Sequence, residues 1–359
     1  MKSRHRSPDP GDTRQPLPYP NGWFAVCLSD ELKPGAVLTV PFAGQELLVY
    51  RTRSGRACIA EPYCPHLGAH LGHGGRIDGE DIVCPFHGLA FAPDGHCVRT
   101  GNGQKPPFAA LSHQHTCEVN GAVFTWRDSS GQPPNFALPE FGFEGFSRPH
   151  SSSAEPTGYV QDMVENTADV AHFPVLHGFT DTAVTHHADG CRITFELSGR
   201  WHGVAVTMCF TSHGLGYTEG EINIPNLAVR VRTQSFATPL APLRWKFRWS
   251  DALRIPRLDA LPVALRAVIY AALSGAAHRW FARVARADFE IWNHRQYLEH
   301  PKLVAGETSV AALRRWSKQF YPVAELAVND RATSIVLGRT THLPEEPEER
   351  GISTLVTNK

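Results

Sequence analysis

Two short motifs, each with one cysteine and one histidine, constrain this chain more than any other feature. The first is Cys64-Pro-His66 and the second is Cys84-Pro-Phe-His87, and both stand in loops rich in proline and glycine. Thiolates are soft metal ligands and imidazoles are intermediate ones, so these side chains suit either zinc or an iron–sulfur cluster. The chain must therefore fold so that the tips of two loops meet at one metal centre.

The supply of ligands distinguishes zinc from a cluster. Structural zinc sites usually take paired cysteines or paired histidines from one knuckle. Here each loop offers a mixed pair, which fits a [2Fe–2S] cluster with two cysteines on one iron and two histidines on the other. We therefore favour the cluster over zinc. The motifs resemble those of the Rieske family at all four positions, which implies Cys64, His66, Cys84 and His87 as ligands.

The resemblance also bears on the reduction potential. High-potential Rieske proteins carry serine and tyrosine hydroxyls two and four residues after the second histidine ligand. Those positions are Leu89 and Phe91 here. Fewer hydrogen bonds to the cluster sulfurs leave the reduced state less stabilised, so the resemblance implies a potential near the low end of the Rieske range.

The chain has 359 residues, enough for about two domains. Residues 21–128 alternate short apolar runs with turn residues, which indicates an all-β domain, and the resemblance implies that this is the Rieske domain. Residues 1–20 are polar and proline-rich, lack the apolar core of a signal peptide, and are expected to be disordered. Residues 129–158 are rich in proline, glycine and serine and predict a linker. Residues 159–345 form the expected second domain, followed by a tail over residues 346–359.

The second domain has a different pattern. Three runs alternate strictly between apolar and other residues: Cys191–Leu197, Val204–Phe210 and Leu243–Trp249. This alternation predicts antiparallel strands with one face on a core. Helical patterns cover residues 162–171, 258–299, with a break near Ser274-Gly275, and 308–320. The expected fold class is α+β, with long helices over the apolar face of a twisted sheet.

Composition excludes several classes of function. Lysine plus arginine and aspartate plus glutamate both number 35, so the chain shows no basic surplus for nucleic acid. The apolar stretch Leu261–Ala277 contains Arg266 and is too short to span a membrane well. It is either a core helix or a cover for a channel that admits a large hydrophobic substrate. The six other cysteines are scattered, as expected of buried thiols in a reducing cytoplasm.

A second metal site is indicated around "VENTADVAHFPVLHGF". Asp169 and His172 are three residues apart and share one face of a helix. His177 lies five residues after His172, but Pro174 between them breaks the regular ladder and lets both imidazoles turn inward. On a later helix, Asp288 stands on an apolar stripe, where a carboxylate is costly unless it is paired or bound to metal. We favour a ligand role for Asp288 over pairing with an arginine.

From residue 21 onward the chain resembles the α-subunits of Rieske non-haem iron oxygenases, which join a Rieske domain to a helix-grip catalytic domain. Within that family it is similar to the ketosteroid 9α-hydroxylase, sterol 7-desaturase and aminopyrrolnitrin oxygenase group. The resemblance implies that His172, His177 and Asp288 hold mononuclear Fe(II). It implies that Asp169 connects this iron to the Rieske histidine of a neighbouring subunit in a homotrimer. Asn166 is either a polar support near the iron or an ordinary helix residue.

The resemblance implies a cytoplasmic monooxygenase that uses O₂ and external electrons on a bulky hydrophobic polycyclic substrate, such as a steroid or a natural-product intermediate. The glycines of Gly214–Gly220 lie in a turn without the context of a nucleotide site, so electrons come from a separate NAD(P)H-dependent reductase, with or without a ferredoxin. Desaturation, N-oxygenation and oxidative cyclisation remain open on the same scaffold. A Rieske electron carrier or a zinc-stabilised interaction protein is the alternative from another class.

Overall fold

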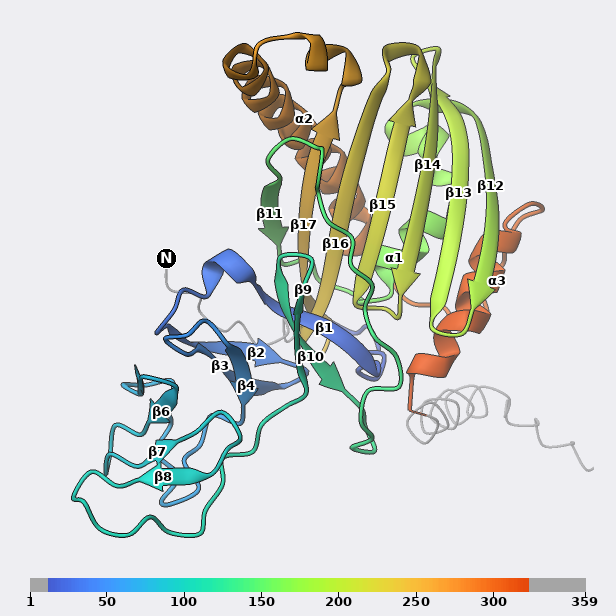
Figure 1. The fold of residues 1–359 in the computed structure, drawn as a ribbon. Coiled ribbons are helices and arrows are strands. Elements are labelled where there is room, and N and C mark those ends of the chain that lie inside the picture. Colours follow the sequence, from blue (N-terminus) through green and yellow to red (C-terminus); the bar gives the residue numbers. More distant parts are fainter. Residues whose placement is uncertain (1–11, 323–359) are drawn as a thin grey trace, which may run out of the picture. The chain divides into compact units, whose positions relative to one another are not determined.

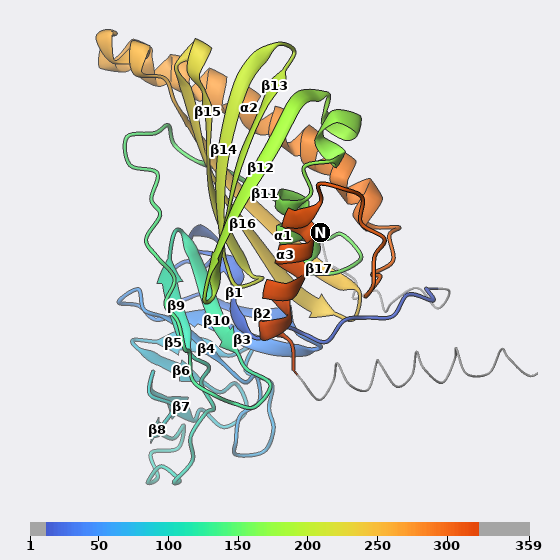
Figure 2. The ribbon, with the colours of Figure 1, turned by 90° about the vertical axis from the view of Figure 1, so that its right-hand side faces the viewer.

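The computed structural model describes residues 12–322. Most of the described chain forms antiparallel sheets, and three α-helices lie against one face of the largest sheet (Figures 1 and 2). An N-terminal group of small sheets precedes this larger sheet along the chain. The expected α+β class, with an all-β N-terminal part followed by an antiparallel sheet with long helices on one face, is confirmed.

Three small sheets form the N-terminal part. The first orders β1 (Gly22–Leu28), β10 (Ala122–Arg127) and β9 (Thr116–Val119). The second orders β2 (Val37–Phe42), β3 (Gln45–Arg51) and β4 (Ala57–Ala60). The third orders β5 (Arg76–Asp78), β6 (Asp81–Val83), β7 (Ala90–Phe91) and β8 (Cys97–Arg99). Because its strands are so short, the third sheet leaves long loops at its ends, and these loops hold the paired cysteines and histidines.

The large sheet has seven strands. Their spatial order is β11 (His150–Ala154), β17 (Arg244–Arg254), β16 (Val229–Ala241), β15 (Tyr217–Ile224), β14 (Val204–His213), β13 (Arg192–Trp201) and β12 (Phe179–Asp189). The three predicted alternating runs fall in β13, β14 and β17. On β13, for example, Ile193, Phe195 and Leu197 are buried while Glu196 between them is exposed. Alternation therefore identified both the strands and the face that is buried.

The two parts of the described chain share a packed apolar layer. Trp23 and Phe124 from the first small sheet pack with Tyr217 and Phe236 from the large sheet. A Cβ atom at Gly216 would stand only 2.1 Å from the backbone oxygen of Trp23, so only glycine permits this approach. β1 therefore lies directly on the large sheet, which limits rotation between the two parts.

The helices are α1 (Asp162–Ala168), α2 (Val263–Trp292) and α3 (Thr308–Ser317). A π-helical turn covers Phe173–His177, and 3₁₀ turns cover Ser29–Glu31, Pro225–Leu227, Pro256–Ala260 and Lys318–Phe320. The helix expected from residue 308 to 320 is thus present, with a 3₁₀ last turn. None of the helices between residues 12 and 322 combines the length and the apolarity that crossing a membrane requires.

Three expectations need correction. The break predicted near Ser274-Gly275 is absent, because α2 runs through both residues; Ser274 is buried and its Oγ lies 3.0 Å from Nε2 of His150. This contact offsets the cost of a helical glycine, about 1 kcal/mol relative to alanine. The predicted linker over residues 129–158 is not all linker, since it contains the edge strand β11, which pairs with β17.

The third correction concerns the N-terminus. Residues 12–20 are placed rather than disordered: Pro20 is buried, and the Tyr159 hydroxyl donates to the Gln15 carbonyl at 3.1 Å. Tertiary contacts with the second domain order this polar segment, which local composition alone does not reveal. Residues 1–11, residues 323–345 of the expected catalytic domain and the tail over residues 346–359 lie outside the described range.

Candidate functional site

Two loops of the N-terminal part are conformational copies of each other. In the first, the N–H of Cys64 donates to Ala69 and the N–H of Gly68 donates back to Cys64. In the second, Cys84 and Gly88 make the equivalent bonds at the same spacing. Both glycines have φ near +70°, at 74° and 68°, a conformation that glycine adopts without strain. The repeated turn explains why each motif places a glycine four residues after its cysteine.

The two copied turns bring their metal-binding side chains together. Cys64 and Cys84 are each only 2% exposed, whereas His66 and His87 are exposed with ring centroids 4.9 Å apart. Burial raises the pKa of the Cys64 thiol to about 11, and the adjacent Cys84 thiol adds to this shift. Two buried sulfurs and two outer nitrogens fit a cluster with an inner cysteine-bound iron and an outer histidine-bound iron.

The side chains beside the cluster loops are apolar. Leu89 and Phe91, which replace hydroxyl-bearing residues, are 4% and 0% exposed and belong to the same buried group as the two cysteines. Neither can donate a hydrogen bond to a cluster sulfur. The expected low reduction potential therefore stays a prediction with a clear physical basis.

The second candidate site begins where α1 ends. The π-helical turn after α1 is closed by the N–H of Gly178, which donates to the Phe173 carbonyl five residues earlier. A π turn holds more residues per turn than an α-helix, so side chains five apart return to the same side. It thereby places His172 and His177 together, their ring centroids 5.1 Å apart. Pro174 stands in its first turn, where its missing N–H costs nothing.

Asp288 on α2 completes the group. Its Oδ1 lies 3.1 Å from Nε2 of His177 and 3.8 Å from Nε2 of His172. One ligand atom from each residue lies within 4.8 Å of the other two, and no second trio of this kind occurs in residues 12–322. Asp288 is 6% exposed and makes no contact with an arginine in the described chain, so the alternative of an arginine partner is not supported.

Among the described residues, the imidazole of His172 lacks the hydrogen bonds that buried imidazoles in proteins normally form. Both of its ring nitrogens are buried, and neither has a hydrogen-bond partner within residues 12–322. Buried polar atoms are otherwise nearly always satisfied, so an unsatisfied imidazole beside a second histidine and a buried carboxylate fits a divalent cation. Two imidazoles and one carboxylate form the facial set that non-haem Fe(II) enzymes use.

Asp169 and Asn166 differ in their relation to this trio. Oδ2 of Asp169 lies 3.6 Å from Nδ1 of His172. Burial works against ionisation of Asp169, but its interactions with His172 outweigh burial and lower its pKa. Asn166 is half-buried in α1 and forms no side-chain hydrogen bond within the described range. The structure thus brings Asp169 to the trio and leaves Asn166 without an assigned contact.

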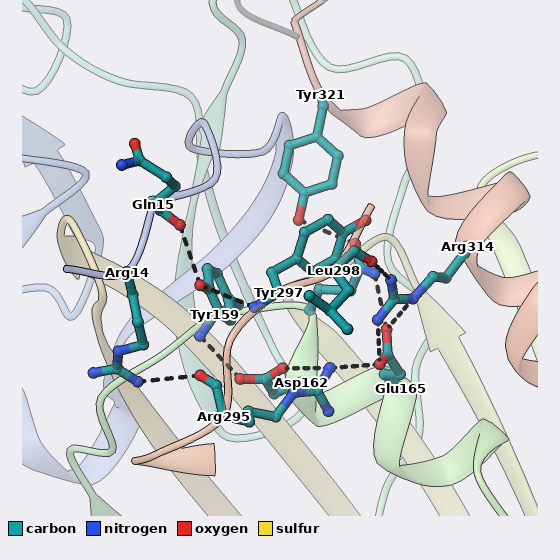
Figure 3. A network of polar contacts seen from close by, with 11 residues as sticks. Arg14, Gln15, Tyr159, Asp162, Glu165, Arg295, Tyr297, Leu298, Arg314 and Tyr321 are labelled. Atoms are coloured by element: carbon teal, nitrogen blue, oxygen red, sulfur yellow. Dashed lines mark hydrogen bonds and ion pairs between the residues drawn. The ribbon is translucent and has the colours of Figure 1, made fainter. Parts of the chain in front are cut away.

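A buried ionic network anchors the segment that carries these histidines (Figure 3). Glu165 of α1 pairs with Arg295 at 2.5 Å and with Arg314 of α3 at 2.8 Å. Burial acts to raise the pKa of Glu165, but the two arginines outweigh it and lower the pKa. Asp162 accepts from the N–H of Tyr159 at 2.9 Å, and burial raises its pKa to about 7. Sequence analysis missed this network because its members come from three separate segments.

An aromatic wall lies beside the trio. Phe247 of β17 packs on Phe289 of α2 with ring centroids 5.6 Å apart, and Trp245 packs on Trp292 at 5.5 Å. Farther along α2, His278 stacks on Trp249 at 6.0 Å. Phe289 follows Asp288 directly and Trp292 lies one helical turn later, and all three are buried on α2, so the wall packs on the helix face that carries Asp288.

A second polar cluster joins α2 to the edge of the sheet. Nδ1 of His278 lies 2.5 Å from Oδ2 of Asp251, and its Nε2 lies 2.7 Å from Oγ of Ser152. Asp251 is 2% exposed. The alternating run Leu243–Trp249 predicted which side chains of β17 face inward, and Asp251 continues that alternation. No local signal pairs Asp251 with a residue of the distant helix.

Comparison with known families assigns two successive parts of the chain to two different families. A family described as the Rieske [2Fe-2S] domain matches residues 22–114. A family described as the 3-ketosteroid 9alpha-hydroxylase C-terminal domain matches residues 125–321. The two matches together cover both candidate metal sites.

Relatives match over most of the chain. The cholesterol 7-desaturase nvd of Bombyx mori is 30% identical over 358 residues, covering 89% of this chain and 73% of the relative. Cholesterol 7-desaturase nvd 1 of Ciona intestinalis is 28% identical, covering 87% of this chain and 70% of the relative. A probable 3-ketosteroid-9-alpha-monooxygenase oxygenase component of Rhodococcus rhodochrous is 26% identical, covering 85% and 81%.

Solved structures share the fold at low identity. Dicamba monooxygenase bound to dicamba superposes with a TM-score of 0.67 at 18% identity, covering 84% of this chain and 96% of that chain. NdmB of Pseudomonas putida CBB5 gives a TM-score of 0.64 at 19% identity, covering 85% and 93%. Similarity at this level of identity establishes the two-part architecture.

Proposed function

The chain belongs to the Rieske oxygenase family with the 3-ketosteroid 9alpha-hydroxylase C-terminal domain, and from this premise we propose that it mono-oxygenates a bulky hydrophobic polycyclic substrate such as a steroid. Enzymes of this family use a [2Fe–2S] cluster, a mononuclear iron and O₂. The observation that carries the proposal is the trio of His172, His177 and the buried Asp288, in which neither ring nitrogen of His172 has a hydrogen-bond partner among the described residues.

The proposed ligands have distinct tasks. Cys64, His66, Cys84 and His87 would hold the cluster, and the buried trio would hold Fe(II). When bound, the cluster passes single electrons and the ferrous iron binds and activates O₂. In the overall reaction, one C–H bond becomes C–OH, the second oxygen atom leaves as water, and two electrons and two protons are consumed. This balance requires electrons from outside the chain.

The aromatic wall supports a hydrophobic substrate. Trp245, Phe247 and Trp249 of β17 and Phe289 of α2 form a buried aromatic cluster on the face of α2 that carries Asp288. A flat polycycle that reached this cluster would be held by burial of apolar area, worth about 25 cal/mol per Å². The named substrates of the relatives, cholesterol and 3-ketosteroids, are polycycles of this kind.

Desaturation is the second candidate, because the cholesterol 7-desaturases are 28% and 30% identical to this chain. Hydroxylation and desaturation differ in whether an oxygen atom enters the substrate or two hydrogen atoms leave it. The trio and the wall serve either outcome. N-oxygenation and oxidative cyclisation have no specific support from the described residues.

Electron supply is the next part of the proposal. A separate NAD(P)H-dependent reductase, with or without a ferredoxin, would deliver electrons to the exposed His66 and His87 edge. Asp169 would then connect the iron of one subunit to the cluster of its neighbour in a homotrimer. Its position 3.6 Å from His172 supports this role.

The variant Asn166→Ala tests whether Asn166 supports the iron site. Slower turnover with both metals retained would support a role for Asn166 near the iron. Unchanged turnover would make Asn166 an ordinary helix residue.

A single-turnover experiment tests the function without knowledge of the natural reductase. The iron-loaded protein is reduced chemically, freed of reductant and exposed to ¹⁸O₂ with cholesterol or a 3-ketosteroid. Mono-oxygenation predicts a product with one ¹⁸O atom, and desaturation predicts loss of two hydrogen atoms. The Asp288→Ala variant, with its cluster intact, is the matched control and should give neither product. Oxidation of the cluster with no product from any polycycle tested would contradict the proposed substrate class.

A further inference from the structure

The outward face of the first half of α2 is apolar and exposed. Leu265 and Val268 are 49% and 67% exposed, and Leu273 at the edge of the same face is 43% exposed. At 100° per residue, Leu265, Val268 and Ala272 lie opposite the buried Ser274. Figures 1 and 2 place the start of α2 at the border of the catalytic domain, away from α1 and α3. A helix on a sheet normally turns polar residues toward water, so this half is unusual.

The same outward face becomes cationic in the second half of α2. Arg279, Arg283 and Arg286 are exposed there, and none has an ion-pair partner in the part of the chain that the structure describes. From Leu261 to Ala287 the sequence contains no aspartate or glutamate. The outer surface of α2 therefore consists of an apolar patch followed by three unpaired guanidinium groups.

We propose that this face of α2 docks on an anionic phospholipid bilayer. The apolar side chains would enter the boundary between headgroups and acyl chains, and the arginines would bind lipid phosphates. Apolar burial and attraction to anionic lipid are the two contributions that hold helices in the plane of a membrane surface. This association is peripheral, which agrees with the lack of a membrane-crossing helix among residues 12–322.

A contact between the α2 helices of two copies fits this face less well. A two-fold contact between antiparallel α2 helices would set the arginines of one subunit against Leu265 and Val268 of the other. Guanidinium groups would then lose water without gaining a carboxylate, which is costly. A parallel contact would oppose like charges. Anionic lipid instead supplies phosphates for the arginines and acyl chains for the apolar half.

The proposal goes beyond the catalytic function and does not depend on it, because lipid binding is measured without substrate or turnover. The full-length protein with its metals is sedimented with vesicles of phosphatidylcholine alone and of equal parts phosphatidylcholine and phosphatidylglycerol. We expect binding to the mixed vesicles that weakens as salt rises, since salt screens surface charge. Wild-type protein that stays in the supernatant with both vesicles would overturn the proposal.

Two pairs of variants locate the surface. Val268→Glu should weaken binding about tenfold, whereas Val304→Glu should not, although Val304 is 65% exposed and so closely matches Val268. Arg283→Glu should weaken binding to the mixed vesicles by about fivefold or more, and Arg315→Glu on α3 is its control. Visible absorbance of the cluster and circular dichroism check that each variant is folded.

Each alternative result is informative. Equal loss of binding in Val268→Glu and Val304→Glu would place the contact elsewhere and overturn the proposal. If Val268→Glu instead dissociates an oligomer in sedimentation velocity, the face is a contact between subunits, and the lipid proposal fails. Should Val268→Glu not fold, the Arg283→Glu and Arg315→Glu pair decides alone. Loss of vesicle binding with normal single-turnover chemistry would separate this surface from the catalytic site.

Discussion

Oδ1 of Asp288 lies 3.1 Å from Nε2 of His177, although 111 positions separate the two residues in sequence. The π-helical turn after α1 presents the histidine and the buried face of α2 presents the carboxylate. With His172 they form a compact set of donors for one divalent cation. The relation between these two residues therefore links the turn after α1 and the C-terminal part of α2 at a single site.

Removal of the carboxylate should abolish iron binding at this site alone. In Asp288→Ala the two histidines remain but the charge that balances Fe(II) is lost. We expect the mononuclear iron to be absent, the cluster spectrum to be unchanged, and turnover to fall by at least about a hundredfold. Iron and sulfide analysis checks this. Glu290→Ala removes an exposed carboxylate two residues away and should keep the iron; loss of iron there too would point to a general effect on α2.

Asp169→Asn should separate metal binding from electron transfer. The amide keeps the size of the side chain but loses the charge that faces His172 at 3.6 Å. We expect both metals to stay bound and turnover to fall by about ten- to a hundredfold. Stopped-flow oxidation of the reduced cluster with substrate and O₂ measures the slowed step. Asp181→Asn, which alters an exposed carboxylate, is the control. Normal cluster oxidation in Asp169→Asn would contradict the role of Asp169 as a connection.

The pH dependence of stability should change when Asp162 is replaced by asparagine. Burial raises the pKa of Asp162 from 3.8 to about 7, so between these values the folded chain holds a proton that the unfolded chain has released. Stability contributed by this proton is present at low pH and is lost as pH rises through the folded pKa. Relative to wild type, Asp162→Asn should therefore gain about 2 kcal/mol between about pH 5.5 and 7.5.

Thermal unfolding at a series of pH values measures this difference as a change in Tm between the two proteins. Asp189→Asn removes an exposed carboxylate and serves as the control for a charge change alone. A difference in Tm between Asp162→Asn and wild type that stays constant across this pH range would show that Asp162 does not titrate with folding.

The cluster potential should depend on the two apolar residues that follow its second histidine. The wild-type potential is expected near the low end of the Rieske range, about −150 mV. Phe91→Tyr and Leu89→Ser each add a hydroxyl close to the cluster loops and should raise the potential, because a donated hydrogen bond stabilises the reduced cluster.

Redox titration followed by electron paramagnetic resonance measures these potentials. Phe108→Tyr adds the same hydroxyl to a fully exposed ring and should leave the potential unchanged. A wild-type potential in the high Rieske range, or no increase in either cluster variant, would refute the argument from Leu89 and Phe91.

Local sequence determined the parts of this protein that depend on neighbouring residues. The mixed cysteine–histidine motifs identified the cluster loops, because a tight turn needs its glycine at a set position beside its ligands. Strict alternation identified β13, β14 and β17, because successive side chains on a strand point to opposite faces. The spacing of His172, Pro174 and His177 indicated a widened turn. Asp288 was identified as a carboxylate out of place on an apolar stripe.

Tertiary structure alone decided what depends on distant segments. In local sequence, nothing distinguishes Glu165, Arg295 and Arg314 from ordinary surface charges. They become a buried network only because α1 packs against α3 and against the segment that follows α2. Ser274-Gly275 carries a local preference for a break, which the contact of Ser274 with β11 overrides. The apolar half of α2 gave no sign of whether its outer face is covered. Burial depends on how the layers of the fold assemble. The sequence therefore predicted that residues 261–277 form a helix, but it did not predict which side of that helix is exposed.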